Sequence, residues 1–312
     1  MKWSGFRIVL MAGFLALSSS FLWGQDLSLR ALNYWDKYDL SDSTLYRPVA
    51  GEDSFSAMES EASNFFALLK NVPDSVARIA VGNYLDKAAL ASRDGFDAYG
   101  QILGIAEKYF YNVNSPYYCE EMLLPFLDHM IARADIPEVE KSREKYLAML
   151  IRRNAVGSKA EDFVFNLIHL PEQLIFTDGD THEPVSLYEI VDIEETLISK
   201  PLLIVFYSAD CRDCLDGIDR LSHSPVVRER VSSGKMNVLV VCVEGNCRSS
   251  VSKMPKDWIV AEDISEEYHK NIVETSLYSV RQTPSVYMLD EKGVVLLKDA
   301  SVSSAIQFLL EQ

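Results

Sequence analysis

The sequence predicts a helical domain followed by an α/β domain with a mixed central sheet, and three observations carry this prediction. The chain has 312 residues, which suits two domains of ordinary size. Apolar residues recur every three or four positions up to about residue 154, as on one face of a helix. After Gly157 the pattern changes to short apolar runs that alternate with helical segments, which is typical of α/β folds.

The first segment, residues 1–24, is predicted to be an export signal. Two basic residues precede an unbroken apolar run from Ile8 to Leu17, and small residues follow it. This apolar stretch is shorter than the ~20 residues that span a bilayer, so we expect cleavage rather than membrane insertion. Cleavage after Gly24 is preferred, with Ser20 as the alternative. The mature chain then enters an oxidising compartment, where disulfides persist.

Residues 25–156 are predicted to form an all-α domain without catalytic residues. Residues 25–54 are interpreted as an extended or irregular lead-in. The cysteine of this domain, Cys119, is expected on the apolar face of the fourth helix as a small buried residue. His129 is expected at the surface or at a helix end. The helices are predicted at 55–69, 73–85, 94–111, 115–130 (opened by Ser115–Pro116 and kinked at Pro125) and 137–151.

Residues 157–312 are predicted to form the α/β domain. The run LLIVFY at 202–207 suits a strand buried on both faces of a sheet, and MNVLVVCVE at 236–244 suits a second one. Further strands are expected at 160–168, 173–180, 280–290 and 294–300, with a turn at 291–293. Helices are expected from the Cys211 motif onward, at 262–278 and at 303–312, and a short helix or loop at 186–199.

The composition excludes several functional classes. With 30 Lys and Arg against 46 Asp and Glu the formal charge is −16, which disfavours nucleic acid and anionic membrane surfaces as partners. A hydrophobic content of 48% excludes a largely disordered chain. The histidines show no metal-ligand spacing, and the sequence lacks GxSxG, HExxH and glycine-rich phosphate-loop motifs. We therefore expect neither a metal nor an organic cofactor.

The strongest chemical signal is the pair Cys211 and Cys214. Two intervening residues at a helix N-terminus bring the sulfurs within disulfide reach. The first sulfur faces free backbone N–H groups, which stabilise the nucleophilic thiolate, and the second thiol can resolve a mixed disulfide. Zinc sites use the same spacing but need two more ligands. Cys242 and Cys247 could supply them, although they leave a strand rather than a zinc knuckle.

These residues lead to a family resemblance. The run VFYSADCRDC after a buried strand, together with Thr283–Pro284 before a later strand, resembles the thioredoxin superfamily and in particular its exported TlpA/ResA-like thiol-disulfide oxidoreductases. The resemblance covers about residues 157–312. It implies a thioredoxin-like fold in which Pro284 is cis and packs against the redox disulfide, while the backbone of Thr283 pairs with the substrate. The helical domain resembles, more weakly, a domain of unknown function that precedes some exported thioredoxin modules.

The resemblance implies a periplasmic disulfide oxidoreductase or isomerase. Cys211 would be the nucleophile, Cys214 the resolving thiol, and Thr283 and Pro284 the substrate-binding residues. The implied partners are exported proteins that contain disulfides, and an upstream dithiol donor in the membrane or the periplasm. The alternative is an exported binding protein in which the thioredoxin module is a scaffold with little redox activity.

Two departures from the family pattern affect proton transfer. Val205 stands where thioredoxins have a buried carboxylate six residues before the first cysteine. Gly217 stands where ResA-like proteins have a glutamate three residues after the second cysteine. The resemblance therefore does not identify the group that deprotonates Cys214, and the candidates are water and Asp216.

Four aspartates surround the motif, at 210, 213, 216 and 219. Carboxylates near a thiol disfavour its thiolate, so the pair is predicted to be reducing rather than strongly oxidising. In the alternative interpretation they only favour the helix N-terminus, with Asp216 paired to Arg220.

Cys242 and Cys247 form a possible second dithiol. Three interpretations are open: Cys242 as core filler with Cys247 free, a local structural disulfide, or a relay with the first pair. Mass spectrometry of the untreated protein distinguishes them.

Overall fold

The structure is a computed structural model that describes most of the chain: residues 26–48, 55–93, 95–112, 115–171, 185–188, 190–192, 195–196, 199–264 and 272–312. The export signal expected at 1–24 and the strand expected at 173–180 lie outside these ranges. Within them, no helix is both long and apolar enough to cross a membrane. The chain divides into two compact units, Met1–Ala148 and Met149–Gln312.

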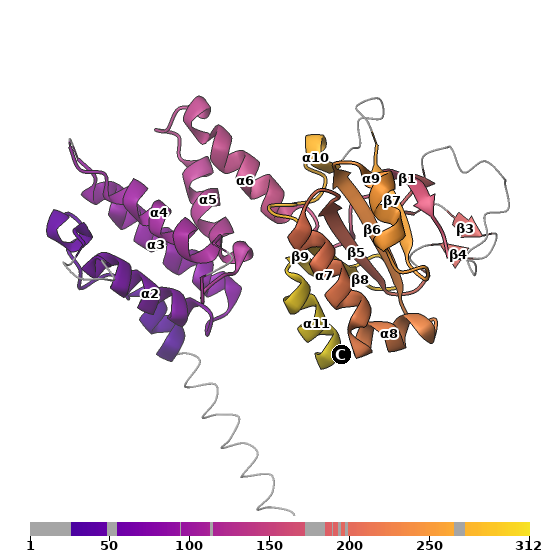
Figure 1. Ribbon diagram of the computed structural model, residues 1–312. Coiled ribbons are helices and arrows are strands. Elements are labelled where there is room, and N and C mark those ends of the chain that lie inside the picture. Colours follow the sequence, from indigo (N-terminus) through magenta and orange to yellow (C-terminus); the bar gives the residue numbers. More distant parts are fainter. Residues whose placement is uncertain are drawn as a thin grey trace, which may run out of the picture. The chain divides into compact units, whose positions relative to one another are not determined.

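The first unit is helical (Figure 1). Its helices begin at side-chain caps where the sequence offers them: Ser56 accepts a hydrogen bond from the Glu59 amide at 3.1 Å, and Asp97 accepts one from the Gly100 amide at 2.9 Å. The elements are η1 (Ser43–Tyr46), α2 (Ala57–Leu69), α3 (Asp74–Ala91), α4 (Ala98–Phe110), η2 (Glu120–Leu123), α5 (Leu124–Ala132), η3 (Glu138–Lys141) and α6 (Ser142–Arg152), which continues into the second unit.

Aromatic side chains fill the core of this unit. Phe66 lies at its centre, with ring centroids 4.5 Å from Phe110 and 5.9 Å from Phe126. The lead-in expected to be extended or irregular is in part helical, at residues 26–32 and in η1, and it packs into this core. Trp35 is 4% exposed and its ring stacks on Tyr84 at 4.0 Å, so burial of large aromatic residues explains why this segment is ordered.

The fourth predicted helix is wrong in its first half. Ser115–Pro116 lies in a turn, and Cys119 stands in extended conformation before η2, partly exposed rather than buried on a helix face. Pro125 does not kink a helix. It occupies the first turn of α5, where proline costs no hydrogen bond because the N–H it lacks would have no partner there.

The second unit contains a mixed sheet, as the sequence predicts, and the described residues contribute seven strands to it. Its order is β2-β1-β7-β6-β5-β8-β9, and the two central pairs, β5·β6 and β6·β7, are parallel. The remaining pairs are antiparallel. The strands are β1 (Val164–His169), β2 (Val185–Ser186), β5 (Leu202–Ser208), β6 (Asn237–Glu244), β7 (Ile259–Asp263), β8 (Ser285–Leu289) and β9 (Val295–Ala300), and a separate pair is β3 (Ile190–Asp192) with β4 (Glu195–Thr196).

Each face of this sheet has its own core. On one face Val205 and its neighbours pack against α7 (Arg212–His223), α8 (Pro225–Ser232) and α11 (Val302–Glu311), which lie in front of the sheet in Figure 1. On the other face Phe206 packs with Phe163 and Tyr278. Because both faces are covered, all seven residues of β5 are buried, as the unbroken apolar run predicts.

Two element predictions in this unit are wrong. The segment expected to be a short helix or loop at 186–199 contains β3 and β4 in its described part. The helix expected to begin at residue 262 begins later, because residues 259–263 form β7, which pairs with β1 and β6. Only α10 (Ile272–Thr275) is helical among the described residues of that stretch. In β7, pairing with strands distant in sequence overrides the local pattern, whereas β3 and β4 pair locally with each other.

Candidate redox site

The two cysteines of the motif meet at the start of α7. Cys211 is the N-cap residue, and its sulfur accepts a hydrogen bond from the Cys214 amide at 3.1 Å. The two residues form a disulfide, with Cα atoms 5.3 Å apart. Cys211 is partly exposed, whereas Cys214 is fully buried. A substrate or donor sulfur in solution can therefore reach only the Cys211 sulfur, which lies where helix N–H groups stabilise negative charge.

The position of this pair follows from strand β5. The strand runs through the middle of the sheet between β6 and β8 and ends at Ser208. The Ala209 amide donates to the Glu244 carbonyl at 2.8 Å, and the Cys211 amide donates to the Ser208 carbonyl at 3.2 Å. These bonds turn the chain from the sheet directly into α7, so the cysteines lie at the carboxyl end of the parallel strands.

Pro284 lies against α7, the helix that carries the redox disulfide. The Thr283–Pro284 bond is cis, and both residues are partly exposed. A Cβ atom on Gly217 would lie 3.2 Å from Cγ of Pro284 and 3.2 Å from Cγ2 of Val302. Gly217 thus lets α11 and the loop that contains Thr283–Pro284, here called the proline loop, approach α7 closely. A side chain at position 217 would therefore press against Pro284 and Val302.

Gly217→Ala is expected to disturb this contact. An alanine in a helix gains up to about 1 kcal/mol in propensity over glycine, and Gly104→Ala in α4, where nothing lies within 4 Å, should show that gain. Overpacking against Pro284 and Val302 should make Gly217→Ala less favourable than Gly104→Ala by at least about 1 kcal/mol in urea unfolding. Equal gains for the two variants would contradict the packing described here.

A buried carboxylate braces the proline loop. Asp299 has a side chain only 3% exposed and accepts hydrogen bonds from Ser285 (2.7 Å), Ser279 (3.3 Å) and the Arg281 guanidinium. These donors stand on both sides of Thr283–Pro284 in sequence, so one carboxylate ties the two arms of the loop together. In the sequence Asp299 is only one of two charged residues near the end of a strand, and our sequence reasoning missed this role.

The described core around Cys214 holds no carboxylate. Val205 and Cys214 belong to the same apolar cluster, in agreement with the departure seen in the sequence. A hydroxyl is present on this face instead: Tyr207 and Ser250 are hydrogen bonded, with their oxygens 2.7 Å apart. Burial raises the pKa of Tyr207 above its ordinary value. Tyr207 is therefore neutral at physiological pH and cannot act as the base for Cys214.

The second pair of cysteines lies at the same edge of the sheet. Cys242 and Cys247 are joined in a disulfide, with Cα atoms 5.6 Å apart. Cys242 is 1% exposed near the end of β6, and Cys247 is the partly exposed first residue of α9 (Cys247–Ser250). This disulfide occupies both thiols in the described structure, and no group of three or more potential metal ligands occurs among the described residues.

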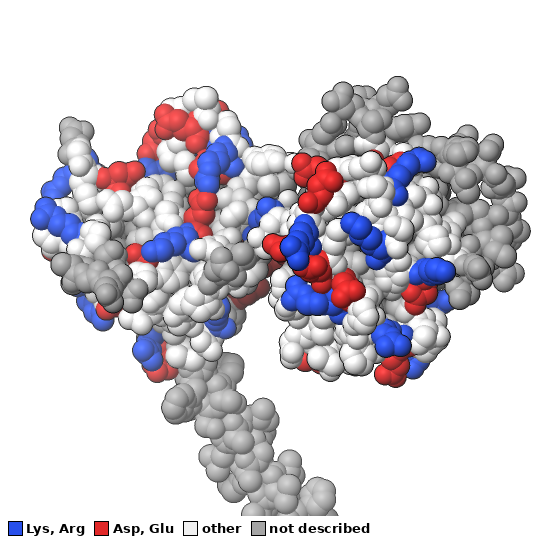
Figure 2. All heavy atoms as spheres, viewed as in Figure 1, with Lys and Arg blue, Asp and Glu red and all other residues white. Residues whose placement is uncertain are grey.

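The acidic residues of α7 are on the surface. Acidic and basic side chains alternate over this part of the molecule (Figure 2). Asp216 pairs with Arg212 at 3.9 Å, not with Arg220 as the sequence suggested, and both side chains are more than half exposed. Asp219 lies 3.4 Å from His223. Such exposed pairs contribute little to stability because water and salt screen them.

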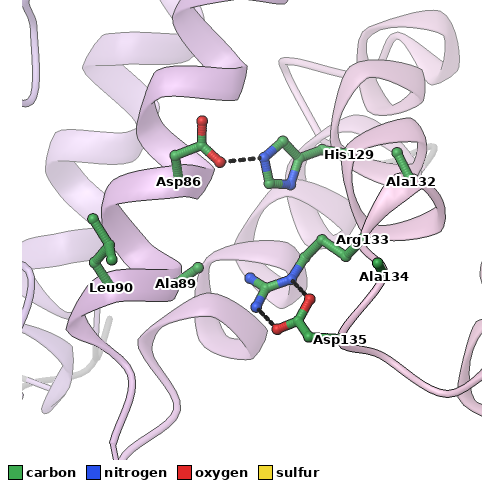
Figure 3. Close-up of a pocket in the computed structure, with 8 residues that line it drawn as sticks. All are labelled: Asp86, Ala89, Leu90, His129, Ala132, Arg133, Ala134 and Asp135. Carbon is green, nitrogen blue, oxygen red and sulfur yellow. Dashed lines mark hydrogen bonds and ion pairs between the residues drawn. The ribbon is translucent and has the colours of Figure 1, made fainter.

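A separate cavity of about 590 Å³ lies in the helical unit (Figure 3). His129 is hydrogen bonded through Nδ1 to the Tyr99 hydroxyl and through Nε2 to Oδ1 of Asp86, each at 3.0 Å. Arg133 stacks 4.6 Å from the Tyr99 ring and bonds Asp135. Burial raises the pKa of Tyr99 to about 12. His129 is thus fixed between two partners, and each basic residue of the cavity already holds a carboxylate.

Comparisons with known proteins agree with this architecture. Residues 31–154 match the family described as "Domain of unknown function (DUF5106)". A thioredoxin-like protein from Bacteroides caccae is similar over 93% of this chain and 94% of its own, with a TM-score of 0.70 and 23% identity. No curated protein matches.

Two shorter solved structures are also similar. A conserved protein of unknown function from Bacteroides fragilis covers 50% of this chain and 98% of its own at 25% identity and a TM-score of 0.39. The thioredoxin domain of a thiol-disulfide oxidoreductase from Bacteroides vulgatus covers 50% and 98% at 14% identity and a TM-score of 0.33. These two scores are too low to bear on the fold. The match to the Bacteroides caccae structure shows that the chain has a thioredoxin-like fold, and the helical segment ahead of it is similar to the unknown-function family DUF5106 over residues 31–154.

Proposed function

We propose that the protein is a thiol-disulfide oxidoreductase that reduces or isomerises disulfides of exported proteins through Cys211 and Cys214. The observation that carries this proposal is the pairing of a partly exposed Cys211 with a fully buried Cys214 at the N-terminus of α7. Pro284 packs on the same helix at Gly217, which supports Thr283 and Pro284 as the substrate-binding residues.

The reaction begins from the reduced pair. The Cys211 thiolate attacks one sulfur of a substrate disulfide, a new bond forms between Cys211 and that sulfur, and the other substrate sulfur leaves as a thiolate that takes up a proton from water. The Cys214 thiol then loses its proton and attacks Sγ of Cys211. This step closes the Cys211–Cys214 disulfide and releases the second substrate thiol.

One turnover moves two electrons and two protons to the substrate. A dithiol donor must return them to the Cys211–Cys214 disulfide, so an upstream dithiol protein in the membrane or the periplasm is part of the proposal. When a third, different cysteine thiol of the substrate attacks the substrate sulfur of the mixed disulfide in place of Cys214, that sulfur forms a new substrate disulfide and Cys211 leaves as a thiolate. The same chemistry then rearranges a substrate disulfide without net electron transfer. The apolar segment at 8–17 supports export as the route to such substrates.

The test is reduction of insulin by dithiothreitol, followed as turbidity, with the full mature chain. Acceleration over dithiothreitol alone supports the proposal. A protein that accelerates neither this reaction nor the rearrangement of a scrambled disulfide substrate would instead fit the binding-protein alternative, in which the thioredoxin-like unit is only a scaffold.

A further inference from the structure

The two disulfides lie on neighbouring parallel strands that end at the same edge of the sheet. In the register of β5 and β6, Tyr207 stands opposite Cys242 and Ser208 opposite Glu244. Cys211 follows β5 after a short turn, and the Cys242–Cys247 disulfide closes a small ring around the turn that follows β6. The two turns therefore run beside each other, and they are in contact.

The contact is made by a glycine inside the ring. Gly245 has φ +88°, and a Cβ atom built on it would lie only 2.6 Å from Oδ2 of Asp210. The Asp210 carboxylate thus rests where a side chain at residue 245 would be. The Ala209 amide, next to Asp210, donates to the Glu244 carbonyl at 2.8 Å. Asp210, the residue just before Cys211, therefore packs against the ring that the Cys242–Cys247 disulfide closes.

A second tie attaches the ring to strand β5. The Tyr207 and Ser250 hydroxyls lie 2.7 Å apart, and the Ser250 hydroxyl also donates to the Cys247 carbonyl at 2.7 Å. Tyr207 and Ser250 are both buried, so this link is shielded from water, where hydrogen bonds are stronger. The Cys242–Cys247 disulfide joins the two ends of the ring, which are the buried end of β6 and the first residue of α9.

We propose that the Cys242–Cys247 disulfide is a positioning element of the redox site. The disulfide holds Gly245 in place, and the Asp210 carboxylate packs against Gly245. The proposal rests on the proposed redox function of Cys211. Without the disulfide the ring opens and Asp210 loses its packing contact with Gly245. The Asp210 carboxylate can then approach the sulfur of Cys211, the next residue. A carboxylate near a thiolate destabilises it and with it the reduced state, so the Cys211–Cys214 pair becomes more reducing.

The test measures the equilibrium of the Cys211–Cys214 pair with a glutathione buffer, using the full mature chain. Cys242→Ser combined with Cys247→Ser should shift this equilibrium about tenfold toward the disulfide, which corresponds to about 30 mV for two electrons. Asp210→Asn removes the charge and keeps the shape of the side chain. In an Asp210→Asn background the two serine substitutions should cause no such shift, whereas a purely structural role of the disulfide would leave the shift unchanged.

Gly245→Ala provides a second route if the serine variant does not fold. It keeps the disulfide but displaces the Asp210 carboxylate, so it should shift the equilibrium in the same direction, and Asp210→Asn should again cancel the shift. Gly234→Ala is the matched control, because Gly234 also has a positive φ, +69°, but nothing lies within 4 Å of its Cβ position. Its backbone strain should leave the equilibrium unchanged.

The outcomes separate this proposal from the proposed function. If the wild-type pair exchanges with glutathione and both the serine and the Gly245→Ala variants keep its equilibrium constant, the positioning role is wrong while the redox function stands. If a shift appears but persists with Asp210→Asn, the role assigned to the carboxylate is wrong. If the wild-type pair does not exchange at all, the redox function itself fails.

Discussion

Cys211→Ser is expected to reduce catalysed insulin reduction by more than about a thousandfold, to the rate of dithiothreitol alone, as loss of a covalent nucleophile does in other enzymes. The physical reason is accessibility. Cys214 is fully buried behind Cys211, so it cannot replace Cys211 as the sulfur that a substrate meets first. A serine hydroxyl at the helix N-terminus is too weakly acidic and too poor a nucleophile to attack a disulfide. The turbidity assay measures the loss directly.

Cys119→Ser is the matched control for this variant. Cys119 is the one free cysteine that the described residues contain, and it lies in the helical unit. Burial and the neighbouring Glu121 raise the pKa of its thiol, so little thiolate is present at neutral pH. Cys119→Ser should retain wild-type activity. Loss of activity in Cys119→Ser, or residual turnover in Cys211→Ser, would contradict the assignment of the nucleophile.

Asp299→Ala is expected to lower the free energy of unfolding by about 3 kcal/mol, the cost of removing one partner of a buried ion pair. The change leaves the Arg281 guanidinium, 19% exposed, without the carboxylate it faces, and it removes the acceptor of the Ser285 hydroxyl. Because Arg281 and Ser285 flank Thr283–Pro284, substrate reduction should weaken as well. Urea unfolding and the insulin assay measure the two effects.

Asp219→Ala is the comparison for Asp299→Ala. Asp219 also pairs with a basic residue, His223, but about 70% of its side chain is exposed, so its loss should change stability by less than about 0.5 kcal/mol. Similar losses in the two variants, or an Asp299→Ala protein as stable and active as the wild type, would show that Asp299 does not brace the loop.

The fold of the redox unit could be predicted because its signals are local. A strand buried on both faces must be apolar throughout, as 202–207 is, and a CxxC pair at the strand end defines both a helix start and a chemistry. The proline loop was found for the same reason, since Thr283–Pro284 is a short motif. Short strands such as β7 were missed because their pairing partners are distant in the sequence.

The remaining features of the site depend on contacts that no local pattern reveals. Position 217 needs a small residue because Pro284 and Val302, which belong to other segments, approach α7 closely there. The buried Asp299 carboxylate is stabilised by donors from the loop before β8 and from Ser285, the first residue of β8. The sequence left the state of Cys242 and Cys247 open, since spacing permits a disulfide without requiring one. In the helical unit, Pro125 shows that a proline inside an apolar run can equally begin a helix.

The most direct test of the redox assignment is mass spectrometry of the mixed disulfide formed by Cys214→Ala. The reduced variant is mixed with a peptide that contains a disulfide, quenched with acid and digested. We predict a peptide linked through Cys211 alone, stable because the resolving thiol is absent, and rapidly lost when Cys214 is present. A peptide attached elsewhere, or no adduct from a variant whose Cys211 thiol is shown to be reduced, would contradict the proposed chemistry.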